Sequence, residues 1–211
     1  MTISTTEQLE QLETEIKTGL KVIIFALGIF QDGSNRGLYT GEEDIPIDDY
    51  FMISSFFGSL FEYAIQGYAR DGSLEGHDMW DIEAFIDIAG PAMEAYDASR
   101  PYLCEQVYCA ALARHKIDCY MGIAIHPING SGSKLIPGFK EEVLTIKEVS
   151  LLANMNEKSV RNATHSTKSE RLQTIKIGTR IYVKPDDALL WLNKRRGFVP
   201  TTVHKRQAYC K

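Results

Sequence analysis

The sequence predicts a mainly α-helical protein with an N-terminal helical domain and a smaller C-terminal domain of short helices and a two-stranded hairpin. Apolar residues recur at intervals of three and four through the first part of the chain, as on one face of a helix. A turn-rich stretch then interrupts this pattern where the charge balance changes sign. We therefore predict an acidic helical domain at 1–128, a linker at 129–140, a second domain at 141–200 and a basic tail at 201–211.

The charge is distributed unequally along the chain. Residues 1–140 contain nine Lys/Arg and 21 Asp/Glu, a net of −12, whereas residues 141–211 contain 14 Lys/Arg and seven Asp/Glu, a net of +7. Such asymmetry indicates that the basic part contacts a polyanion and that the acidic part has another role.

The longest apolar run, Val22–Phe30, has nine residues, fewer than the roughly 20 that a helix needs to cross a bilayer. The residues before it are acidic, whereas a signal peptide begins with basic residues. We therefore expect a cytoplasmic protein that makes no membrane contact.

The cysteines are Cys104, Cys109, Cys119 and Cys210. In the cytoplasm they are expected to be buried, reduced thiols rather than disulfides. A metal site would have to combine Cys109, His115 and Cys119, but this spacing matches no common zinc module. We expect no metal and no cofactor.

The N-terminal domain is predicted to consist of helices that end at Asp-Gly pairs and at Gly90-Pro91. The predicted helices cover Leu9–Phe30, Asp48 or Asp49 to Tyr68, Asp78–Ala89, a short segment to Tyr96, and Pro101 to about His115. The second helix is apolar around most of its circumference, which indicates a central or interface helix. Residues 117–128 are compatible with either a strand or a further helix.

The C-terminal domain begins with a capped helix. Thr145 and Glu148 have the spacing of a capping box, and residues 154–156 form a short turn in which Asn156 can cap a second helix, Glu157 to about His165. Two short helices joined by such a turn are typical of a helix-turn-helix, whose second helix enters the major groove of DNA.

A hairpin and a last helix follow. Residues 172–177 and 181–183 are predicted as two strands joined by a turn at 178–180, which together form a wing. Pro185, Asp186 and Asp187 are predicted to cap a helix that closes at Gly197. Trp191 and Leu192 on this helix are expected in the core.

The segment Thr145–Gly197, about a quarter of the chain, resembles the winged helix-turn-helix module of phage excisionases and MerR regulators. The resemblance is carried by LTIKEVSLLANMNEKSVRNAT at 144–164, IKIGTRIYV at 175–183 and DDALLWLNKRRG at 186–197. Two departures are the polar residues at 164–173, before the wing, and the absence of the MerR dimerisation helix after Gly197. We therefore expect a homodimer to form through the N-terminal domain.

The resemblance implies a recognition helix in the major groove and a wing against the DNA backbone or minor groove. Arg161 can bind guanine O6 and N7, and Asn162 can bind adenine N6 and N7. Lys158, Lys168 and Arg171 are better suited to phosphates. The full predicted DNA-binding set is Lys158, Ser159, Arg161, Asn162, His165, Lys168, Arg171, Lys176, Thr179, Arg180, Lys194 and Arg195. The alternative for Lys194, Arg195 and Arg196 is that they only complement the negative end of their helix dipole.

These expectations describe a DNA-binding transcriptional regulator that is not an enzyme and acts on double-stranded DNA as a homodimer. A first alternative is an adaptor whose acidic domain recruits a partner protein to DNA. A second is a nucleic-acid enzyme that uses Glu75, His77, Asp78, Asp81 and Glu83. Helix capping and an acidic solvent face explain this cluster equally well, and no HExxH, phosphate-binding loop or GxSxG motif is present.

Overall fold

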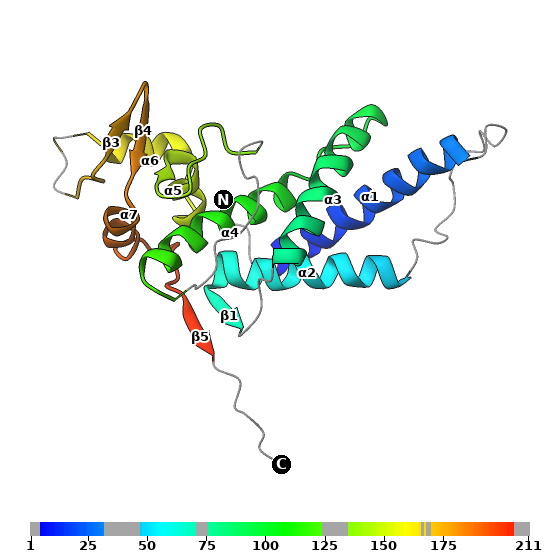
Figure 1. The fold of residues 1–211 in the computed structure, drawn as a ribbon, viewed down its shortest axis with the longest axis horizontal. Helices are drawn as coiled ribbons and strands as arrows, with labels where there is room; N and C mark the ends of the chain where they lie inside the picture. The colour runs from blue at the N-terminus through cyan, green and yellow to red at the C-terminus, as the bar shows by residue number, and fades with distance from the viewer. Residues whose placement is uncertain are drawn as a thin grey trace, which may run out of the picture. The chain divides into compact units, whose positions relative to one another are not determined.

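The computed structural model describes residues 5–31, 47–70, 76–123, 135–165, 167 and 170–204 (Figure 1). These residues contain seven helices, a three-stranded antiparallel sheet and a two-stranded parallel pair, so the prediction of a mainly helical protein is confirmed. They form two compact units, an N-terminal unit within residues 1–59 and 77–105 and a C-terminal unit within 60–76 and 106–211. None of the described helices is long and apolar enough to span a membrane.

The first part of the chain forms four long helices and one short strand. Their bounds are α1 Thr5–Gln31, α2 Ile47–Gln66, β1 Tyr68–Arg70, α3 Gly76–Ala95 and α4 Tyr102–Tyr120. Residues 117–128 were compatible with a strand or a helix. Because α4 continues to Tyr120, residues 117–120 are helical. Residues 124–128 lie outside the described residues.

Close packing of α1 against α3 organises the N-terminal unit. A Cβ atom on Gly19 would lie 2.7 Å from the ring of Phe85 and 3.1 Å from Cβ of Ala89, so any other residue would require these side chains to move. Phe85 also makes an edge-to-face contact with Phe57, with ring centroids 5.6 Å apart. The Glu15 carboxylate accepts hydrogen bonds from the backbone N–H groups of Leu103 and Cys104 at 2.8 and 3.0 Å, which satisfies the first turn of α4.

Several predicted helix boundaries are wrong. α4 continues past His115 to Tyr120, and α7 ends at Leu192 rather than at Gly197. The second helix ends before Tyr68, because Gly67 adopts a left-handed conformation with φ of +68° and Tyr68–Arg70 pairs in parallel with β5, Thr202–His204. The third helix does not end at Gly90-Pro91 but runs through Pro91 to Ala95. Pro91 is exposed, so a backbone carbonyl that loses its N–H partner there can be hydrated.

The C-terminal unit contains the shorter elements. Their bounds are β2 Leu144–Thr145, α5 Ile146–Leu152, α6 Glu157–Ala163, β3 Ile175–Ile177, β4 Arg180–Val183 and α7 Pro185–Leu192. The strand order is β2-β4-β3, with Ile175 opposite Tyr182 and Leu144 opposite Val183. Lys184 is the N-cap of α7 and makes no side-chain capping bond. The predicted capping by Asp186 and Asp187 is therefore wrong, because both lie inside the first turn.

One apolar core joins these elements. Val149 of α5, Val160 of α6 and Leu192 of α7 are fully buried, and Trp191 is 4% exposed. The core position predicted for Trp191 and Leu192 is thus confirmed. Ala113 and Ile117 of α4 belong to the same cluster, so the core also includes residues that precede the predicted linker.

Cys104, Cys109 and Cys119 form no disulfide, and Cys210 lies outside the described residues. Cys104 and Cys109 are buried as expected, but Cys119 is exposed, with its Sγ 3.2 Å from His115 Nε2. Burial raises the pKa of Cys104 well above its ordinary value. Within the described part of the chain, no three His, Cys, Asp or Glu side chains are grouped to hold a metal ion.

Candidate nucleic-acid interface

The predicted capping box at the start of α5 is confirmed. Thr145 Oγ1 accepts a hydrogen bond from the N–H of Glu148 at 3.2 Å, and Glu148 Oε2 accepts one from the N–H of Thr145 at 2.7 Å. Each side chain therefore satisfies a backbone donor that the helix leaves free. This local bonding fixes where α5 begins.

A buried ion pair attaches α5 to α4. Lys116 Nζ donates to Glu148 Oε1 and, at 3.1 Å, to the carbonyl of Val143, and it lies 3.8 Å from the centroid of the Phe139 ring. The side chains of Lys116 and Glu148 are 5% and 0% exposed. Burial lowers the pKa of Lys116, and the charge of Glu148 opposes that shift. The start of α5 is thus held by a residue of α4.

The predicted cap of α6 is also confirmed. Asn156 Oδ1 accepts a hydrogen bond from the N–H of Ser159 at 2.7 Å. The turn before it contains Asn154 with φ of +49°, a conformation that asparagine tolerates better than most residues. With Val160 buried, Arg161 and Asn162 are left exposed.

The hairpin β3–β4 turns at Gly178, whose φ of +61° favours glycine. Lys176, Thr179 and Arg180 are all exposed. The hydroxyl of Tyr182 donates to the carbonyl of Gly138 at 3.0 Å, which fixes the base of β4 to the segment before β2.

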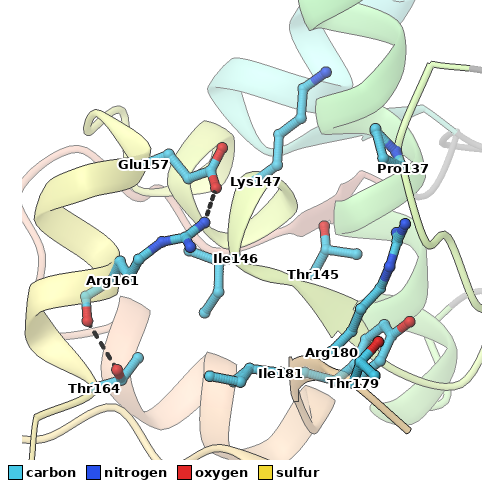
Figure 2. A pocket seen from close by; sticks show the side chains of 11 residues that line it. Pro137, Thr145, Ile146, Lys147, Glu157, Arg161, Thr164, Thr179, Arg180 and Ile181 are labelled. Carbon is cyan, nitrogen blue, oxygen red and sulfur yellow. Dashed lines mark hydrogen bonds and ion pairs between the residues drawn. The ribbon is translucent and has the colours of Figure 1, made fainter. Parts of the chain in front are cut away.

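A cleft of about 550 Å³ lies between α6 and the hairpin, and we call it the hairpin-side cleft (Figure 2). Three basic residues from three elements line it: Lys147 of α5, Arg161 of α6 and Arg180 of β4. Arg161 forms an ion pair with Glu157, and both side chains are largely exposed, at 65% and 45%. Arg180 lies against Gly138, where any Cβ atom would collide with the guanidinium.

A second cleft, of about 570 Å³, lies between α6 and α7, and we call it the α7-side cleft. Ser159 and Asn162 line it from α6. Arg195 also lines it, but its guanidinium pairs with Glu170 at 3.1 Å and lies 4.2 Å from the centroid of the Trp191 ring. The guanidinium of Arg195 is therefore held against the fold.

The structure thus divides the predicted DNA-binding residues into groups. Arg161, Thr179 and Arg180 meet in the hairpin-side cleft, and Ser159, Asn162 and Arg195 in the α7-side cleft. The remaining described members are exposed and line neither cleft: Lys158, His165, Arg171, Lys176 and Lys194. Lys168 lies outside the described residues. The sequence prediction missed Lys147, whose only signal is its place beside the capping box.

The carboxylates considered for an enzyme site are only partly described. Glu75 and the side chains of His77 and Asp78 lie outside the described residues. Asp81 and Glu83 are two positions apart on α3, and side chains at this spacing do not face each other.

No family model, curated protein or solved structure matches the chain. The interpretation of the two clefts therefore depends on their own residues and geometry.

Proposed function

We propose that residues 141–200 are a winged helix-turn-helix that binds duplex DNA, with α6 as recognition helix and β3–β4 as wing. The protein is then a DNA-binding transcriptional regulator. The observation that carries this proposal is the hairpin-side cleft, which is lined by the exposed cations Arg161 of α6 and Arg180 of the hairpin (Figure 2). Lys147 also lines the cleft, but its Nζ donates to the carbonyl of Leu135 at 3.0 Å and is therefore held against the fold. Positive charge placed on both a helix and a hairpin matches the way that phosphates flank a groove.

The proposed base-reading residues are Arg161 and Asn162. α6 is an α-helix, and the diameter of a helix with its side chains, about 10–12 Å, fits the major groove, which is about 12 Å wide. The Arg161–Glu157 pair is exposed, and such pairs contribute only about 0–1 kcal/mol. Arg161 can therefore exchange Glu157 for a guanine edge at small cost.

Five other exposed cations are proposed to position the module on phosphates. They are Lys158 on α6, Arg171 before the hairpin, Lys176 and Arg180 on the hairpin, and Lys194 after α7. Arg195 is different, because its side chain is only 24% exposed and its guanidinium lies over the Trp191 ring. We assign Arg195 to the support of α7 rather than to DNA.

We propose a homodimer, because one small module contacts few base pairs and helix-turn-helix proteins commonly read two half-sites. The acidic N-terminal unit is the expected dimerisation domain. Sedimentation velocity of the full chain at several concentrations tests this part, and a constant monomer mass would contradict it.

A binding titration tests the proposed function. The full chain is added to a fluorescein-labelled random duplex of about 30 base pairs, and anisotropy is read from about 50 to 200 mM salt. We expect a strong fall in affinity with salt, about ten- to a thousandfold if several phosphates are neutralised. Arg180→Ala should weaken binding, whereas Lys21→Ala, which removes an exposed charge from α1, should not. Absence of binding at low salt, or equal loss in both variants, would contradict the proposal.

The second candidate is the adaptor, in which the N-terminal unit recruits another protein to DNA. One observation favours it specifically: Trp80 and Ile88 on α3 are large apolar side chains that are each 54% exposed.

A further inference from the structure

Two buried N–H groups of the C-terminal unit have no hydrogen-bond acceptor among the described residues. They are Nε1 of Trp191, a residue that is 4% exposed, and Nε of Arg195, whose side chain is 24% exposed. More than about nine in ten buried polar groups of folded proteins are paired. Two unpaired donors on side chains in contact therefore mark a place that suits an acceptor.

Both side chains line the α7-side cleft. The guanidinium carbon of Arg195 lies 4.2 Å from the centroid of the Trp191 ring, so the two donors belong to one stacked pair. The volume of this cleft, about 570 Å³, is within the range of small-molecule sites. Ser159 and Asn162 line it from α6, so a ligand in the cleft would lie against the proposed recognition helix.

Glu170 uses only part of the Arg195 guanidinium. Its Oε2 lies 3.1 Å from Nη2 of Arg195, whereas Nε has no acceptor among the described residues. Nε and Nη2 share one edge of the guanidinium, and a carboxylate that spans this edge accepts from both nitrogens. The Glu170 side chain is 56% exposed, and ion pairs with such exposure stabilise a fold only slightly. A ligand carboxylate can therefore replace Glu170 on this edge.

The other residues of the cleft favour a ligand with an apolar body. Met155, Ala163 and Trp191 line it, and of the described lining residues only Arg195 and Glu170 are charged. One cation can balance a single carboxylate, but it cannot balance a phosphate monoester, which carries nearly two negative charges. The lining therefore selects a monoanion with an apolar body rather than a phosphate.

We propose that the α7-side cleft binds a small organic monocarboxylate with an apolar body. The carboxylate takes the place of Glu170 on the Nε–Nη2 edge of Arg195, where it also accepts from Nε1 of Trp191. The apolar body lies along Met155 and Ala163, beside α6. This inference does not depend on DNA binding.

The fluorescence of Trp191 tests the inference. The chain has two tryptophans, so Trp80→Phe leaves Trp191 as the only one, and the full chain with this change is titrated with 3-phenylpropionate. We expect a saturable change with a dissociation constant of about 1 mM or lower. 3-Phenylpropionamide has nearly the same shape but no charge, and it should bind at least about tenfold more weakly.

Substitutions in the Trp80→Phe background separate the proposed contacts from general charge attraction. Arg195→Lys keeps the positive charge but removes Nε and the guanidinium edge, so it should weaken binding at least about tenfold. Arg196→Lys is the matched control, because Arg196 is exposed and does not line the cleft, and it should leave binding unchanged. Glu170→Gln removes the competing carboxylate and should strengthen binding about threefold or more.

Four results would overturn the inference. They are no saturable change with 3-phenylpropionate, equal binding of the acid and the amide, equal binding by Arg195→Lys and Arg196→Lys, and no gain in affinity with Glu170→Gln. If circular dichroism shows that Arg195→Lys does not fold, Glu170→Gln decides, because Glu170 is largely exposed. No DNA is present in the titration, so failure here is distinguishable from failure of the proposed function.

Discussion

The C-terminal unit pairs basic residues with carboxylates in two contrasting environments. Lys116 and its partner Glu148 are buried, with side chains 5% and 0% exposed, whereas Arg161 and its partner Glu157 are 65% and 45% exposed. Breaking the first pair leaves a charge in the interior, and breaking the second leaves two hydrated ions. The comparison teaches that solvent exposure, rather than the presence of a partner, decides whether a cation holds the fold or can exchange its partner for a ligand, which we propose to be DNA.

The largest effect is expected at Lys116. Lys116→Met should destabilise the protein by about 3–5 kcal/mol, because Glu148 then remains buried without its partner. Urea unfolding measures the loss. The double variant Lys116→Met/Glu148→Gln should recover part of it, since glutamine keeps the capping position without a charge. If Lys116→Met were as stable as the unaltered protein, the buried Lys116–Glu148 pair would contribute no more to the fold than the exposed Arg161–Glu157 pair.

The next effect concerns DNA rather than stability. Arg161→Ala should weaken binding to the preferred sequence by about 1–3 kcal/mol if the arginine makes a bidentate base contact. Its thermal midpoint should stay close to that of the unaltered protein. Anisotropy with preferred and random duplexes measures the difference. If Arg161→Ala lowered stability but left sequence preference unchanged, Arg161 would stabilise the fold, as Lys116 does, rather than read DNA.

Arg195→Ala should show the reverse pattern. Its ring contact and its ion pair are each worth about 0.5–1 kcal/mol, so we expect a stability loss of about 1 kcal/mol and little change in DNA affinity. Thermal unfolding measures the stability of the variant, and anisotropy measures its DNA affinity. If affinity falls more than stability, Arg195 contacts DNA and our assignment of it is wrong.

A smaller change is expected at Lys176 on the hairpin. Lys176→Ala should weaken binding to all duplexes alike and reduce the slope of log affinity against log salt by about one. Lys21→Ala serves again as the charge-matched control. A loss confined to one sequence would instead make Lys176 a base-reading residue.

The stability of the protein should also depend on pH through the buried carboxyl group of Asp118. Burial raises the pKa of Asp118, although hydrogen bonds from Tyr63 at 2.6 Å and Thr201 at 3.0 Å and the charge of Arg114 oppose the shift. The carboxyl group of Asp118 therefore binds its proton more strongly in the folded protein than in the unfolded chain. The protonated form stabilises the fold at low pH, and this stabilisation is lost as the pH rises from about 3.8, the ordinary pKa of the group, through its raised pKa. Relative to Asp118→Asn, the unaltered protein should lose stability over that window. A difference that is constant with pH would contradict this.

Capping residues in the sequence correctly predicted where α5 and α6 begin, because helix capping depends only on residues that are close in the chain. Thr145 with Glu148, and Asn156, indicated both helix starts because their bonds reach only three residues along the chain. The break predicted at Pro91 was wrong, because exposure of that residue allows the helix to continue. Lys116 could not be found, since its contact with Glu148 spans 32 residues. The ion pair of Arg195 with Glu170 was hidden by the same limit, because Glu170 lies before the hairpin. The stacking of Arg195 on Trp191, which covers its side chain, is a contact between neighbouring turns and could have been expected from the spacing.

The most direct measurement is selection from a random duplex pool with the full chain and with Arg161→Ala in parallel. If α6 reads DNA as proposed, the unaltered chain enriches a short motif containing a guanine, and Arg161→Ala loses preference at that position while still binding duplexes. The contrary result is a pool that stays random with the unaltered chain, or the same motif enriched with equal strength by both proteins.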